Sequence, residues 1–135
     1  MLDRAGLGAY IDARYHEPGD QLFRLERLTF YADNAATLTR WQNGETEPDW
    51  DSRWSKTLAA ERDRGLVQRR VRVLSADLSD DERASCLLAY PTNGRFEQIR
   101  VLRVGEHPMP DLPAEDYWLM RPAAGGVHVL SLIHI

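Results

Sequence analysis

Residues 49–75 have the sequence DWDSRWSKTLAAERDRGLVQRRVRVLS, which predicts a helix followed directly by a β-strand. In the first part of this stretch, large apolar residues recur at every fourth position: Trp50, Trp54 and Leu58. We expect this stripe to pack into the core, with Asp49 or Asp51 capping the N-terminus of the helix. Gly65 follows the last helical turn, at the position where a glycine commonly ends a helix.

The second part of the stretch, VQRRVRVLS, alternates with a period of two, as a half-buried strand does. Three valines fall on one side of this strand: Val67, Val71 and Val73. Arg70 and Arg72 fall on the other side. The alternation therefore indicates a strand with one apolar side and one basic side.

Upstream of this stretch, the pattern predicts two helices and a strand. Residues 22–31 alternate apolar and charged side chains and are rich in aromatic residues, as strands are. Asp33 or Asn34 can cap a following helix, which Gly44 ends. Residues 7–16 predict a short amphipathic helix at the N-terminal end. Together these segments form a strand, helix, helix, strand crossover.

Downstream, the chain contains more strands than helices. A Ser-Asp-Asp-Glu capping box at residues 79–82 begins a helix through Leu87 or Leu88, and residues 91–94 end it. The further strands are expected at residues 96–104, 117–120 and 127–130, with a proline-rich connector at 107–116. The prediction is an α/β fold at the border with α+β. It has a single mixed sheet of about five strands, parallel first and antiparallel at the end, and three to four packing helices.

The composition is that of one soluble globular domain. The chain has 135 residues, 43% of them apolar and 28% charged, with a formal net charge of −4. We assign residues 1–130 to a single domain, and the negative charge argues against direct nucleic-acid binding. The longest uncharged stretch, residues 122–135, has 14 residues, fewer than the roughly 20 that cross a bilayer. We therefore expect a cytoplasmic protein without a membrane partner.

The sequence contains no pattern typical of a catalytic, metal or cofactor site. Its single cysteine, Cys86, excludes a disulfide within the chain and favours a reducing compartment. The four histidines lie far apart, without the short ligand spacing of zinc sites. No G-x-S-x-G elbow and no glycine-rich phosphate loop occurs. We predict no catalytic residues, no metal and no cofactor.

Candidate ligand-binding residues lie at the ends of the predicted strands: Arg24, Glu26, Arg70, Arg72, Asp116 and Trp118. Loops at the strand ends of an α/β sheet commonly bind ligands. The alternative is an internal salt-bridge network with Trp118 packed against it.

A second candidate is a cluster of arginines: Arg62, Arg64, Arg69, Arg70 and Arg72. Such a cluster could hold an anionic ligand or a nucleic-acid backbone. The alternative is that Glu61, Asp63 and Glu26 neutralise it.

Several short motifs occur in a recognisable order. They are FRLE (23–26), W-x-N-G-E (41–45), W-x3-W (50–54), R-x-V-R-V-L-S (69–75), L-S-D (78–80), I-R-V-L (99–102) and P-x-x-D-Y-W-L (113–119). Over about residues 20–130 they resemble an uncharacterised actinobacterial family known only as a domain of unknown function, number sixty-eight seventy-nine. Members are often encoded near helix-turn-helix regulators, so the resemblance implies a regulatory or sensing partner role.

The same resemblance implies that the family domain continues beyond this chain. We therefore expect a domain that is truncated at its C-terminus. Residues 131–135, within the final LSLIHI, are expected to be an artefactual tail of metagenomic origin.

The order of strands and connectors also resembles half of a phospholipase-D-like sheet. Active members of that group need the motif H-x-K-x4-D, in which histidine is the nucleophile. Here His128 is followed by Val129 and Leu130, and no lysine occurs after Lys56. This resemblance implies a catalytically inactive copy.

Two functions follow as expectations. The first is a noncatalytic ligand-sensing or protein-interaction domain, partnering a helix-turn-helix transcription regulator. The alternative is a small hydrolase or transferase acting on a phosphorylated substrate, with Arg70, Arg72 and a carboxylate such as Glu26 or Asp116. The first requires no catalytic group, and we favour it.

Overall fold

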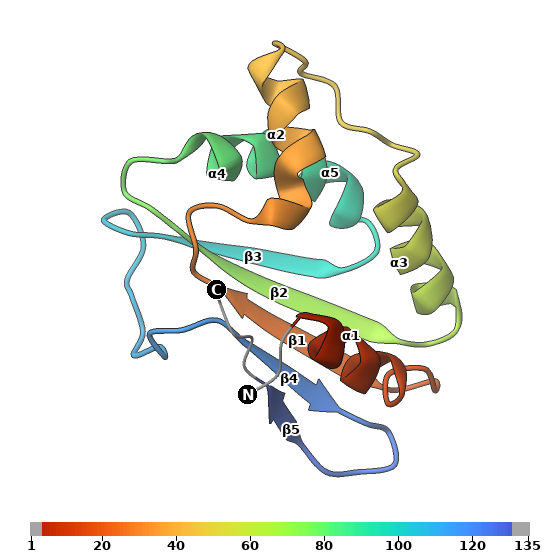
Figure 1. The fold of residues 1–135 in the computed structure, drawn as a ribbon. Helices are drawn as coiled ribbons and strands as arrows, with labels where there is room; N and C mark the ends of the chain where they lie inside the picture. Colours follow the sequence, from red (N-terminus) through yellow and green to blue (C-terminus); the bar gives the residue numbers. More distant parts are fainter. Residues whose placement is uncertain (1–3, 131–135) are drawn as a thin grey trace.

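The computed structural model describes residues 4–130, which form one mixed five-stranded sheet covered by helices (Figure 1). The strands are β1 (Gln21–Glu26), β2 (Val67–Leu74), β3 (Gln98–Arg103), β4 (Tyr117–Arg121) and β5 (His128–Leu130), in the order β3-β2-β1-β4-β5. β1, β2 and β3 are parallel to one another, whereas β4 and β5 are added in antiparallel orientation. The predicted fold class and the change from parallel to antiparallel pairing are confirmed.

The helices are α1 (Arg4–Asp12), α2 (Ala35–Gln42), α3 (Arg53–Asp63), α4 (Asp80–Ala84) and α5 (Tyr90–Asn93). A 3₁₀ turn, Ala32–Asn34, leads into α2, and a π-helical segment, Ser85–Ala89, joins α4 to α5. None of the helices within residues 4–130 is long and apolar enough to cross a membrane. The expected tail at 131–135 lies outside the described residues.

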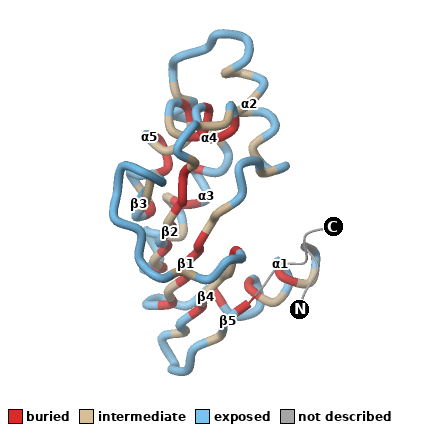
Figure 2. The backbone as a smooth tube through the Cα atoms, turned by 90° about the vertical axis from the view of Figure 1, so that its left-hand side faces the viewer, coloured by how far each residue is buried: buried red, intermediate tan, exposed pale blue. Residues whose placement is uncertain are grey.

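All described helices lie on one side of the sheet. In the turned view the strands are seen nearly end-on, and α1 and α2 both lie to the same side of them (Figure 2). Directly paired residues of neighbouring strands share a face of the sheet. Arg24 pairs with Arg70 in the strand register, and the contacts of this face are made with α3, α4 and α5. The other face of the sheet carries no helix of residues 4–130.

Several element boundaries differ from the prediction. The first helix lies at Arg4–Asp12 rather than 7–16, and the first strand ends at Glu26 rather than at residue 31. Ser52, not Asp49 or Asp51, caps α3, because its hydroxyl accepts from the Ser55 N–H at 3.1 Å. The Asp49 carboxylate instead accepts from the Asp51 N–H at 3.2 Å, which forms a local turn.

The two tryptophans of the predicted stripe, Trp50 just before α3 and Trp54 in its first turn, are not part of the core, contrary to the prediction. Trp50 is 48% exposed and Trp54 is 40% exposed, whereas Leu58 is 1% exposed. The side chains that meet the two indoles are guanidinium groups. Arg95 lies 5.0 Å from the Trp50 ring, and Arg24 lies 5.8 Å from the Trp54 ring. The tryptophans therefore cover arginines at the edge of the helical layer rather than filling an apolar interior.

The predicted capping box at the start of α4 is confirmed. Ser79 Oγ accepts from the Glu82 N–H at 3.1 Å, and Glu82 accepts from the Ser79 N–H at 2.9 Å. The helical backbone continues beyond the predicted Leu87 or Leu88, through the π-helical segment into α5, and ends at Asn93, within the predicted terminator at 91–94. Pro91 lies in the first turn of α5, where no backbone donor is needed.

The apolar core lies under α1, at one end of the sheet: Leu7, Ile11, Tyr15, Leu22, Leu66, Met120 and Leu130. Between the sheet and α3, α4 and α5 the buried side chains are mostly polar or charged. This polar layer contains most of the predicted site residues.

Candidate functional site

The three predicted site arginines point into the protein, beneath the helices. Arg24 on β1 and Arg70 and Arg72 on β2 are all buried, and Arg72 is 0% exposed. The valine side of β2 is therefore not the side that the helices cover. A basic side chain can occupy this position only if carboxylates pair with it, because an unpaired buried charge is very costly.

Glu97 supplies most of that pairing. Its Oε2 lies 3.1 Å from Arg24 Nη2, and its Oε1 lies 2.7 Å from Arg70 Nη2. Glu26 adds a second carboxylate, 3.4 Å from Arg70 Nε. The Trp118 ring covers the pair from the β4 side, with Arg24 Cζ 4.9 Å from its centroid. Four of the predicted site residues are thus brought together around Glu97, which the sequence analysis missed.

Burial and neighbouring charges shift the pKa values of Arg24 and Arg70 in opposite directions. Burial, and next the neighbouring Arg70 charge, lower the pKa of Arg24 from its ordinary value. Burial acts in the same direction on Arg70, but Glu26 and Glu97 outweigh it, so that the pKa of Arg70 is raised. Both guanidiniums stay cationic at neutral pH.

Arg72 belongs to a neighbouring set of contacts. Its Nη2 lies 3.4 Å from Asp81 Oδ2 and donates to the Leu28 carbonyl at 3.1 Å. Its Nη1 donates to the Tyr90 hydroxyl at 3.3 Å, and its guanidinium lies 4.6 Å from the Tyr31 ring. Asp81, the second partner that the sequence analysis missed, comes from the first turn of α4.

Asp116 forms no ion pair with the buried Arg24, Arg70 or Arg72. It accepts the Arg27 N–H at 2.6 Å and the Tyr31 hydroxyl, and so ties the connector before β4 to the end of β1. Burial, and then the bond to Asp116, raise the pKa of the Tyr31 phenol above its ordinary value. Asp116 is thus linked to Arg72 only through the Tyr31 side chain.

We call this set the arginine network: Arg24, Glu26, Arg70, Arg72, Asp81, Glu97, Asp116 and Trp118. Its contacts are those of an internal salt-bridge network against which Trp118 packs. Ligand binding by the six predicted residues stays a prediction.

The wider arginine cluster is divided by the sheet. Arg62 on α3 donates to the Arg95 carbonyl at 2.7 Å. Arg69 directly precedes the buried Arg70 on β2, and its side chain therefore points to the opposite face. Of the predicted neutralising acids, Glu26 is within ion-pair distance of Arg70.

The helix-free face of the sheet is the second feature of interest, and we call it the open face. Its residues follow from the strand register: Gln21, Phe23, Leu25, Val67, Arg69, Val71, Val73, Gln98, Arg100, Leu102, Tyr117, Leu119, Arg121 and Val129. Most of its apolar side chains are half-buried, but Leu25 and Val73 are buried at 1% and 6% exposure, and Val129 is 64% exposed. The Phe23 and Tyr117 rings pack against each other, with centroids 5.8 Å apart.

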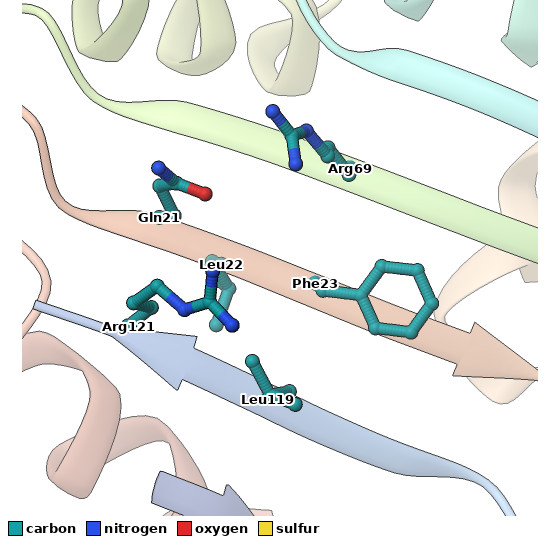
Figure 3. Close-up of a pocket in the computed structure, with 6 residues that line it drawn as sticks. All are labelled: Gln21, Leu22, Phe23, Arg69, Leu119 and Arg121. Atoms are coloured by element: carbon teal, nitrogen blue, oxygen red, sulfur yellow. The ribbon is translucent and has the colours of Figure 1, made fainter. Parts of the chain in front are cut away.

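A shallow hollow lies in this face (Figure 3). Its volume is about 190 Å³, and it is lined by Gln21, Leu22, Phe23, Arg69, Leu119 and Arg121. Arg69 and Arg121 extend from the strands on either side of β1, while Phe23 comes from β1 itself (Figure 3). The hollow thus joins two guanidiniums to an apolar surface.

Comparison with known families identifies most of the described chain. The family described as "Domain of unknown function (DUF6879)" matches residues 9–128. The chain belongs to this family. No curated protein and no solved structure is similar enough to match.

The DUF6879 match extends from α1 to the start of β5 and so includes nearly all of the sheet. The whole arginine network lies within it, as does the open face except for Val129. Both features therefore belong to the family domain rather than to a separate segment.

One signal in the sequence could have found the missing partners of this DUF6879 domain. Once Arg24, Arg70 and Arg72 are placed on one face beneath helices, Glu26 alone leaves two positive charges without a carboxylate. Glu97 directly precedes β3, the next strand of the parallel sheet, and Asp81 lies in the loop-to-helix turn after β2. The need to balance the buried arginine charges therefore indicates Glu97 and Asp81 as their missing carboxylate partners.

Proposed function

We propose that this domain is a noncatalytic protein-interaction domain that binds a helix-turn-helix transcription regulator through its open face. The observation that carries this proposal is the absence of a helix within residues 4–130 on that face. Parallel strands are normally covered on both sides, and β1, β2 and β3 are parallel. A partner that covers the open face would complete the usual three-layer arrangement.

The chemistry of the open face supports a protein partner. Apolar and aromatic side chains at its centre, with arginines among them, match the composition of protein interfaces. The family resemblance to proteins encoded near helix-turn-helix regulators supports the choice of partner.

The alternative, a hydrolase or transferase acting on a phosphorylated substrate, stays a prediction. Arg70 and Arg72, which would bind the phosphate, are buried and already contact Glu26, Glu97 and Asp81. A substrate would have to displace these carboxylates to reach them. The open face requires no such rearrangement.

Co-purification tests the proposal. A helix-turn-helix regulator is sought among the genes that flank the gene of this domain. It is expressed with the tagged domain, and the retained regulator is quantified. We expect the regulator to be retained by the wild type. The double variant Phe23→Asp and Leu119→Asp should bind at least about tenfold less, because a charge placed at a central apolar position of an interface is costly.

Leu87→Asp is the matched control, since Leu87 is an exposed leucine on the helical side of the domain. It should retain the regulator as the wild type does, and circular dichroism should show that all variants are folded. Equal loss in both variants, or no retention by the wild type, would contradict the proposal.

A further inference from the structure

The open face carries three arginines and no acidic residue. Arg69, Arg100 and Arg121 are all exposed. Among residues 4–130, no carboxylate lies within ion-pair distance of any of the three guanidiniums, in contrast to the buried arginines of the other face. The face is therefore locally cationic in a chain whose net charge is −4.

The strand register places these arginines along one diagonal. Arg121 pairs with Gln21, Arg69 with Phe23, and Arg100 with Val71. Each step along the diagonal therefore moves across the strands and forward by two residues. With strands about 4.8 Å apart and about 3.3 Å per residue, the row spans about 20 Å between its terminal Cα atoms.

Eight apolar residues fall on one side of this diagonal: Phe23, Leu25, Val71, Val73, Leu102, Tyr117, Leu119 and Val129. Leu25 and Val73 are buried within the domain, so the other six form the accessible apolar surface. On the other side lie Gln21, Gln98 and the single apolar residue Val67. The hollow between Arg69 and Arg121 lies at the boundary and has room for one side chain of a partner (Figure 3). The open face thus presents an apolar surface bordered by a row of positive charges.

An element that lies on a sheet face cannot use the sheet's backbone groups, so it must satisfy its own hydrogen bonds internally. An α-helix does so, and helices are the usual cover of parallel strands. About 13 residues of helix span 20 Å, with an apolar stripe and an acidic flank side by side. Carboxylates about two turns apart on that flank would match the arginine row.

A single-stranded nucleic acid fits this face less well. Such ligands need exposed aromatic rings on which bases stack, but Phe23 and Tyr117 tilt against each other at 44°. Three arginines are also few compared with the phosphate contacts that nucleic-acid binding proteins make.

We infer that the open face docks an acidic amphipathic helix of the partner protein. This inference rests on the proposed function and specifies the chemistry of the partner. The apolar stripe of the helix covers Phe23, Tyr117 and Leu119, and its acidic flank pairs with the arginine row.

Peptide binding to the full chain tests this inference. The probe is a labelled helical peptide of about 18 residues, long enough to be stable as a helix, with a leucine stripe flanked by glutamates. A matched peptide carries lysines in place of the glutamates. We expect fluorescence anisotropy to show binding of the acidic peptide and at least about tenfold weaker binding of the basic one.

Substitution of the arginine row should produce the same loss. The triple variant Arg69→Gln, Arg100→Gln and Arg121→Gln should bind the acidic peptide about tenfold more weakly, as expected for three exposed ion pairs. The control triple variant, Arg53→Gln, Arg64→Gln and Arg83→Gln, removes exposed arginines of the helical side. It should bind like the wild type.

Several results would overturn the inference. They are equal binding of both peptides, equal loss in both triple variants, tighter binding of a single-stranded oligonucleotide than of the acidic peptide, or a dimer in sedimentation that the arginine substitutions dissociate.

The two proposals can also fail separately. If the regulator co-purifies equally with wild type and the arginine-row variant, the protein-interaction function stands and the acidic helix is excluded. If the acidic peptide binds as expected but the regulator does not co-purify, the helix chemistry stands and the regulator is excluded.

Discussion

At the scale of single residues, charge pairing rather than apolar character decides which side of β2 lies beneath the helices. The alternation on β2 would favour the valine side as the buried one. The structure places Arg70 and Arg72 beneath the helices instead, because Glu26, Glu97 and Asp81 meet them there. The sequence shows which residues share a side of the strand, but not which side is covered, since that depends on acids far away in the chain.

Glu97 pairs with two buried arginines, Arg24 and Arg70, so its charge stabilises the fold. Glu97→Gln keeps the shape of the side chain but leaves Arg24 and Arg70 with less negative charge. We expect the free energy of unfolding at neutral pH to fall by about 3 kcal/mol or more, as when one partner of a buried ion pair is removed. Urea denaturation measures this.

Glu106→Gln is the control, because Glu106 forms an exposed pair with Arg103 at 3.3 Å. The free energy of unfolding of this variant should fall by less than about 1 kcal/mol. Similar losses in the two variants would mean that the network around Glu97 contributes no more than a surface ion pair.

At the scale of elements, the capping box of α4 was predicted correctly, whereas the cap of α3 and the burial of Trp50 and Trp54 were not. The Ser-Asp-Asp-Glu sequence predicted the start of α4, because a capping box is made of neighbouring residues only. The stripe of Trp50, Trp54 and Leu58 predicted the helix but not its exposure. The surface under α3 is occupied by arginines, and that depends on how distant strands pair.

The capping box also predicts how stability depends on pH. Glu82 is fully buried; burial alone would raise its pKa, but backbone donors of Ser79 and Ser75 hold the pKa below its ordinary 4.5. A carboxyl with a lowered pKa in the folded state stabilises the fold fully above its unfolded pKa. This contribution is lost as the pH falls through the folded pKa.

Glu82→Gln should therefore be less stable than wild type at pH 7, with a shallower loss of stability on acidification to about pH 3. Urea midpoints across this pH range measure the difference. Glu115→Gln, which changes an exposed acid, should follow the wild-type curve. Parallel curves for Glu82→Gln and wild type would show that Glu82 has the same pKa in both states.

At the scale of the whole molecule, the sequence predicted a single mixed sheet and where its pairing changes from parallel to antiparallel. It did not predict that the described helices cover only one face. The alternation on β1 and β2 favours the side of Phe23, Leu25 and the valines as the covered one, whereas the helices cover the side of the arginines. The candidate site was predicted in part for the same reason: the buried arginines were found, but the cationic row on the other face was not.

This one-sided arrangement predicts different costs for neighbouring residues of β4. Met120 is fully buried and lies in the core under α1, whereas Leu119, one position away, lies on the open face. Met120→Ala should lower the free energy of unfolding by about 2–5 kcal/mol, since it removes apolar contacts and leaves a cavity. Leu119→Ala should cost less than about 1.5 kcal/mol, because a half-exposed side chain leaves no cavity.

Urea denaturation of the isolated domain measures the free energy of unfolding of both variants. The comparison is direct, because both substitutions lie on β4 and both truncate a large apolar side chain to alanine. An equal cost would mean that the open face is already packed in the free protein. A partner helix would then have no uncovered surface to bind, and both proposals for this face would fall together. A much larger cost for Met120→Ala than for Leu119→Ala would show that the open face contributes little to the stability of the isolated domain. Its apolar side chains are then available for binding a partner.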